Sequence, residues 1–113
     1  MDDFLEEAKE AYDNGLYAAA VVMSHAAVKI GLGGMLKKDG ASLKDLAEEA
    51  YRNGADVGVK DLRRLSWIRN RIEQEGYVPR RQEALWAVGT AERNLGAFKG
   101  RGLLSRVLGW LSP

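Results

Sequence analysis

An apolar segment near the N-terminus, residues 16–36, restricts the fold more than any other feature of the sequence. Ser24, His25, Lys29 and three glycines interrupt it, so it is expected to be a buried helix and no membrane span. A helix that is apolar around most of its circumference needs neighbours on nearly every side. The segment therefore predicts a helical bundle with this helix at its centre.

Four further segments carry apolar residues at helical spacing, namely residues 3–13, 42–53, 59–75 and 80–98. Turn signals separate them: Asn14-Gly15, Asp39-Gly40, Asn53-Gly54 and the run Gly76 to Pro79. No stretch alternates long enough to indicate a strand, and the short connections favour antiparallel neighbours. At 113 residues the chain is expected to be one all-α domain, an antiparallel four- to five-helix bundle over residues 1–99.

Residues 100–113 are expected to lie outside this bundle. A glycine-rich basic hinge, Lys99 to Gly102, precedes a short apolar helix from Leu103 to Leu111. We favour packing of this helix on its own bundle or on a dimer mate. Docking in a partner's groove and binding to a membrane surface are the alternatives.

Composition narrows the possible chemistry. The chain has no cysteine and a single histidine, which excludes disulfides, thiolate metal sites and a histidine metal cluster within one chain. We accordingly expect no metal and no cofactor. The acidic N-terminus does not resemble a signal peptide, which favours a cytoplasmic protein. Basic residues dominate positions 60–81, which indicates an anionic partner for that region or contact with the acidic start.

The most informative stretch runs from Arg69 to Tyr77, at the end of the fourth expected helix. Helical geometry makes Asn70 and Gln74 neighbours on one face, with Arg69 beside them. On residue types alone, Arg69 and Glu73 could equally form a routine surface ion pair worth about 0.3–0.5 kcal/mol.

This stretch resembles the motif of HEPN domains, in which an Arg and a polar residue precede a His by a few positions and a Gly-Tyr turn often follows. Arg69 and Asn70 match the first two positions, and Gln74 stands where the histidine would be. The segment from Gly15 to Leu36 is similar to the family's buried second helix, and the helix order agrees from about Phe4 to Phe98.

The resemblance implies a metal-independent RNase, a nucleotide-binding partner or a toxin of a toxin–antitoxin or defence system. It further implies a homodimer that joins two motifs in one cleft, and a possible partner of the minimal nucleotidyltransferase type. Arg69, Asn70 and Gln74 would be the catalytic positions. Arg64, Arg71 and Tyr77 would be further contacts to nucleic acid.

The glutamine decides what activity to expect. An arginine stabilises a charged phosphorane, but Gln74 cannot carry a proton as a histidine does near neutral pH. General acid–base catalysis contributes about 10²–10⁴-fold. We therefore expect binding of RNA or a nucleotide with little or no RNase activity.

Two other interpretations are weighed beside this one. His25 is expected to be a buried histidine hydrogen-bonded to a neighbour and no catalytic group. The alternative function is a non-enzymatic adaptor, because Tyr12, Gly15, Tyr17, Ala20 and Ala27 also resemble a tetratricopeptide helix pair. One such pair cannot form a stable array, since stacked repeats need about three units.

Overall fold

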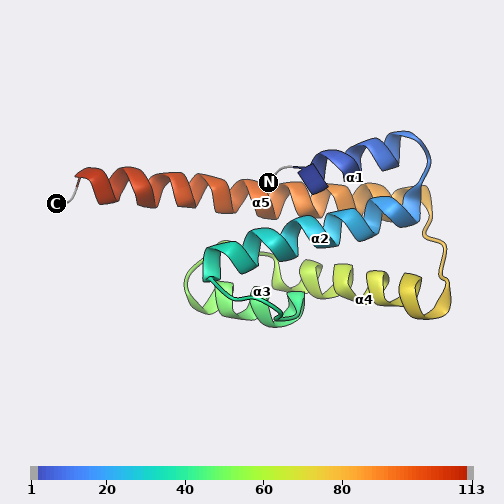
Figure 1. The fold of residues 1–113 in the computed structure, drawn as a ribbon, viewed down its shortest axis with the longest axis horizontal. Coiled ribbons are helices and arrows are strands. Elements are labelled where there is room, and N and C mark those ends of the chain that lie inside the picture. The colour runs from blue at the N-terminus through green and yellow to red at the C-terminus, as the bar shows by residue number, and fades with distance from the viewer. Residues whose placement is uncertain (1–2, 112–113) are drawn as a thin grey trace.

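The computed structural model describes the backbone of residues 3–111 and the side chains of residues 4–96. The described residues form five helices and no strand, so the all-α bundle is confirmed (Figure 1). The helices are α1 (Asp3–Asp13), α2 (Tyr17–Leu36), α3 (Leu43–Arg52), α4 (Val59–Glu75) and α5 (Arg81–Leu111).

Most helix ends fall where the turn residues predict them. Gly15, Gly54 and Gly76 adopt positive φ angles of 76°, 86° and 65°. Glycine reaches this left-handed region without the steric cost that a Cβ brings. At the start of α3, the Ser42 hydroxyl accepts a hydrogen bond from the backbone N–H of Asp45 at 3.2 Å. This is the first half of the expected capping box.

The end of α2 differs from the expectation. The helix stops at Leu36 instead of continuing to about Lys38, and Lys37 takes the left-handed position with φ 55°. The N–H of Lys38 then bonds back to the carbonyl of Gly33 at 2.9 Å. A Cβ on Gly33 would lie 3.0 Å from the carbonyl oxygen of Lys38, so the missing side chain lets the chain fold back this closely.

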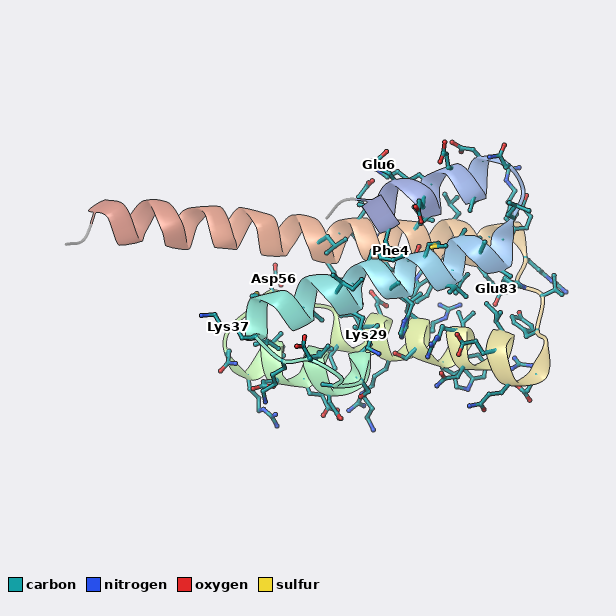
Figure 2. The ribbon with its side chains drawn as sticks, viewed as in Figure 1. Phe4, Glu6, Lys29, Lys37, Asp56 and Glu83 are labelled. Atoms are coloured by element: carbon teal, nitrogen blue, oxygen red, sulfur yellow. The ribbon has the colours of Figure 1, made fainter. Side chains whose placement is uncertain are left out.

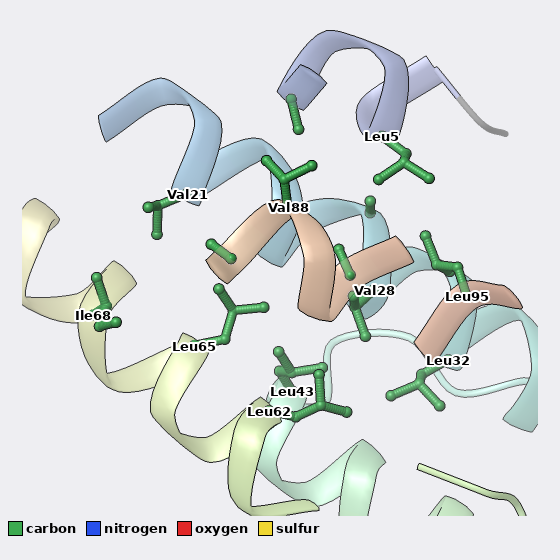
Figure 3. Packing of buried hydrophobic residues seen from close by; sticks show 14 of the residues in the cluster. Leu5, Val21, Val28, Leu32, Leu43, Leu62, Leu65, Ile68, Val88 and Leu95 are labelled. Carbon is green, nitrogen blue, oxygen red and sulfur yellow. The ribbon is translucent and has the colours of Figure 1, made fainter. Parts of the chain in front are cut away.

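A single hydrophobic core surrounds α2, which packs against all four other helices (Figure 3). Val21, Val28 and Leu32 of α2 are fully buried. The core residues that the other helices contribute include Leu5, Leu43, Leu62, Leu65, Ile68, Ala84, Ala87, Val88, Ala91 and Leu95. The predicted central position of this helix is therefore confirmed. At 20 residues, α2 is also long and apolar enough to cross a membrane on length and composition alone, a test that core helices of bundles also pass.

Side chains of α5 also form hydrogen bonds with the loops before and after α4. The buried Asn94 accepts a hydrogen bond from the N–H of Gly58 at 3.0 Å and donates to the carbonyl of Thr90 at 2.8 Å. Glu83 accepts a bond from the N–H of Arg80 at 3.0 Å and one from the Tyr77 hydroxyl at 2.5 Å. The loops on either side of α4 are thereby held against α5, and α4 is fixed beside α2.

The fifth helix is longer than expected. It runs without a break to Leu111, so the hinge predicted between Lys99 and Gly102 is replaced by continuous helix. Glycine inside a helix costs only about 1 kcal/mol relative to alanine, and two glycines do not by themselves force a break. The last turns extend beyond the ends of the other helices (Figure 1). The expected burial of the tail leucines concerns side chains outside the described residues.

Candidate functional site

Two adjoining cavities of about 520 and 470 Å³ open between α2, α3 and α4. His25, Lys29 and Arg69 line both cavities, so we treat them as one site and call it the α2–α4 cleft. Lys29 projects from α2 toward the side of the bundle that α3 and α4 occupy (Figure 2). The other polar residues that line the cleft are Lys38, Asp39, Ser42, Lys44, Arg63, Ser66 and Asn70.

Arg69 occupies the wall of the cleft on α4. About a third of its side chain is exposed. Nη2 lies 3.0 Å from a carboxylate oxygen of Glu73, and Nη1 donates to Asn70 Oδ1 at 3.5 Å. Its Nε is buried and has no hydrogen-bond partner among the described residues. Because Nε is out of reach, the partly exposed end of the guanidinium is the part of Arg69 that faces the cleft.

His25 lies across the cleft on α2 and is only 6% exposed. Its Nε2 is 3.4 Å from the hydroxyl of Ser66, a long contact that joins α2 to α4. Burial, together with the smaller effect of the positive charges on Arg69 and Lys29, lowers the pKa of His25 to about 4. The ring is therefore neutral at pH 7. The expected buried histidine with a neighbouring hydrogen-bond partner is confirmed.

The lining of the cleft carries more positive than negative charge. It has five Lys and Arg side chains against the single carboxylate of Asp39. Carboxylates outside the lining pair with three of these cations: Glu49 with Lys38, Glu48 with Arg63 and Glu73 with Arg69.

Two lysines of the cleft are not neutralised in this way. Lys29 and Lys44 form no ion pair within residues 4–96. The N-terminus of α3, at Ser42 and Lys44, also borders the cleft. A helix N-terminus adds partial positive charge and free N–H groups, which favours an anion at this position.

The structure brings together only part of the predicted motif. Arg69 and Asn70 both line the cleft, and their side chains touch. Gln74 lies one turn further along α4, is exposed, and does not line either cavity. Within one chain, the position that corresponds to the family's histidine therefore lies outside the cleft.

The three residues expected to contact nucleic acid lie elsewhere on α4 and its C-terminal turn. The guanidinium of Arg71 lies 4.9 Å from the ring centroid of Trp67 and 4.4 Å from that of Tyr77. Arg64 covers the ring of Trp86 on α5 at 4.5 Å. The hydroxyl of Tyr77 is held by Glu83, and this hydrogen bond raises the pKa of Tyr77. These side chains form an outer basic and aromatic surface beside the cleft.

Sequence reasoning missed three residues of the cleft, Lys29, Lys44 and Ser66, and it did not connect the buried His25 with Arg69. One signal was available, because His25 and Lys29 are four residues apart and so share a face of an otherwise apolar helix. The same is true of Ser66 and Arg69, three residues apart on α4. Which two polar faces meet depends on the packing of α2 against α4, and spacing along the chain does not encode that.

The comparisons with known proteins add no assignment. No family model matches the chain, and neither the curated proteins nor the solved structures contain a match. Within the described residues, no cluster of three or more His, Asp or Glu side chains could hold a metal ion. What the cleft offers chemically is hydrogen-bond donors and positive charge around a neutral imidazole, which suits a phosphate or another anion.

Proposed function

We propose that this protein binds RNA or a nucleotide through the α2–α4 cleft and has little or no RNase activity. The observation that carries the proposal is the position of Arg69. It meets His25 and Lys29 in a cavity that has an excess of positive charge. Planar guanidinium groups bind phosphate through charge-assisted hydrogen bonds, and about a third of the Arg69 side chain is exposed at the cleft.

The weak activity follows from the lack of a proton carrier both in the cleft and at the histidine position of the motif. Gln74 offers an amide that can donate and accept hydrogen bonds but cannot transfer a proton. His25 does not replace the missing histidine, because a ring with a pKa of about 4 that is almost fully buried is a weak base with poor access to a ribose hydroxyl. The cleft can hold a phosphate without the proton transfer that cleavage requires.

The resemblance of residues 69–77 to HEPN domains supports the same proposal and extends it to a homodimer. The apolar face of α2 beside the cleft supports this extension, since Val22, Ala26 and Ile30 line the cavity and Ile30 is 46% exposed. A second copy packed on that face would bring two clefts together. A role in a toxin–antitoxin or defence system, with a nucleotidyltransferase-type partner, belongs to the same proposal.

The test compares the parent with Arg69→Ala, Gln74→His and the double variant. Binding of a labelled single-stranded oligoribonucleotide is measured by fluorescence anisotropy, and cleavage is followed in excess chelator. Arg69→Ala should weaken binding about 10- to 100-fold, the loss expected for a hydrogen bond to a charged group. Gln74→His should raise cleavage above the parent level, and adding Arg69→Ala should abolish the gain.

Circular dichroism of each variant controls for unfolding. Lys60→Ala, which removes an exposed cation from α4 outside the cleft, is the matched control and should bind like the parent. If neither the parent nor Gln74→His binds RNA or a nucleotide, the proposal is wrong and the adaptor interpretation takes its place. If Gln74→His binds but never cleaves, the cleft lacks more than its histidine.

A further inference from the structure

Trp67 is the most unusual exposed side chain next to the cleft. It lines one of the two cavities together with Ser66, Arg69 and Asn70, and yet 57% of its surface is exposed. Large aromatic side chains gain free energy from burial, so an indole left this open at the edge of a basic cavity is available to a ligand.

Two arginines on α4 lie near this indole. The guanidinium of Arg71 lies over the ring at 4.9 Å, and Arg63, one turn earlier on α4, lines the same cavity as Trp67. Carboxylates pair with both arginines, Glu75 with Arg71 at 3.0 Å and Glu48 with Arg63. More than half of Trp67 stays open even with Arg71 in place.

Proteins that bind single-stranded nucleic acid combine such elements: cations along the path of the backbone and an open aromatic ring on which a base stacks. Paired bases inside a duplex cannot reach a side chain in this way. Tyr77 is less suited to this role, because it is only partly exposed, does not line the cleft, and has its hydroxyl held by Glu83.

We propose that Trp67 stacks on a base of single-stranded RNA whose adjacent phosphate lies in the α2–α4 cleft against Arg69. This inference rests on the proposed function. It narrows the ligand class to single-stranded RNA and excludes duplex RNA and free phosphate. Trp67 is then a binding residue that acts on the base, whereas Arg69 acts on the phosphate.

The experiment separates these two contacts with two ligands. Labelled oligoadenylate carries bases and phosphates, and pyrophosphate, used as a competitor of the labelled strand or titrated directly, carries phosphates alone. Arg69→Ala should weaken binding of both ligands. Trp67→Ala should weaken oligoadenylate binding about 10- to 100-fold, as expected for the loss of one stacked base, and leave pyrophosphate binding unchanged.

Trp67→Phe, which keeps an aromatic ring, should retain most of the affinity. Tyr51→Ala is the matched control, since Tyr51 is 64% exposed beside Arg52 and Lys60 but does not line the cleft. It should bind oligoadenylate like the parent. The same oligoadenylate annealed to its complement should compete more weakly than the single strand.

Each contrary outcome overturns a different statement. If the parent binds pyrophosphate and oligoadenylate and Trp67→Ala binds both as tightly, the stacking role is wrong while the cleft still binds phosphate. If the parent binds neither ligand, the proposed function fails first. If Trp67→Ala leaves RNA binding intact but changes the molar mass in light scattering, the indole belongs to a protein interface and the inference is overturned.

Discussion

The two sides of α2 are built differently. Toward α5 the contact is closed and apolar: Ala84, Ala87 and Ala91 are fully buried, and a Cβ on Gly31 would lie only 2.7 Å from Leu95. Toward α4 and the start of α3, Lys29 and the buried His25 border open cavities and meet Ser66 and Arg69 instead.

The difference comes from the neighbouring helices more than from α2 itself. The helix is apolar around nearly its whole circumference, and the small alanines of α5 allow close packing against it. On the other side, α4 presents a hydroxyl and a guanidinium that need polar partners. One side of α2 therefore contributes mainly stability, and the other borders the open cavities.

The largest expected effect compares Leu32 and Ile30, two aliphatic residues on opposite sides of the same helix. Leu32 is fully buried and Ile30 is 46% exposed. Leu32→Ala should lower the free energy of unfolding by about 2–5 kcal/mol, the cost of removing a core leucine and leaving a cavity. Within a single chain, Ile30→Ala should cost less than about 1 kcal/mol, and any larger loss would report the proposed contact with a second copy. Urea denaturation followed by circular dichroism measures both.

Equal losses of unfolding free energy for the two variants would show that Ile30 is buried in solution. The two sides of α2 would then not differ in burial. A second copy of the chain is the proposed cover, and light scattering after size exclusion tests it. Ile30→Glu should shift the mass from dimer to monomer. Leu85→Glu, at an equally exposed leucine on α5, should leave the mass unchanged.

A middle-sized effect is expected from pH. The pKa of His25 is about 4 in the folded protein against an ordinary value of 6.5, so the unfolded chain binds more protons between these values. Stability should therefore fall as the pH drops below 6.5, by about 2 kcal/mol between pH 7 and pH 5. His25→Gln should remove this dependence, although its stability at pH 7 can differ from the parent's.

Thermal melts at pH 7, 6 and 5 supply the measurement. The range stays above the ordinary pKa of the carboxyl groups, which limits their contribution. If parent and His25→Gln lose stability in parallel, the histidine is not held neutral by burial. The polar side of α2 would then be wetter than the structure indicates.

The smallest effect on stability is expected at Glu73, which pairs with Arg69 at the surface. An exposed pair four residues apart on a helix contributes about 0.3–0.5 kcal/mol, so Glu73→Gln should barely change the melting temperature. It should nevertheless strengthen oligoribonucleotide binding several-fold, because it removes a negative charge and frees Arg69. Glu75→Gln, which frees Arg71 outside the cleft, gives the matched comparison. An unchanged affinity in Glu73→Gln would count against Arg69 as the phosphate contact.

Much of the fold could be predicted from the sequence because the signals are local. Ser42 and Asp45, Asn14-Gly15 and Gly76 act within a few residues of themselves, and they mark helix ends that the structure confirms. The end of α2 and the hinge at residues 99–102 are the local predictions from which the backbone differs. At the hinge, glycine only lowers helix stability and does not end a helix as proline does.

By itself the sequence determined the five helical segments, the central position of α2 and the stretch from Arg69 to Tyr77 as the place to look for a function. Only the tertiary structure decided that His25 and Lys29 of α2 face Arg69 and Ser66 of α4, while Gln74 stays outside this cleft. The physical reason is that helical periodicity assigns residues to faces of one helix. Which faces of two helices meet, and which side chain stays open as Trp67 does, follows from how the whole core packs.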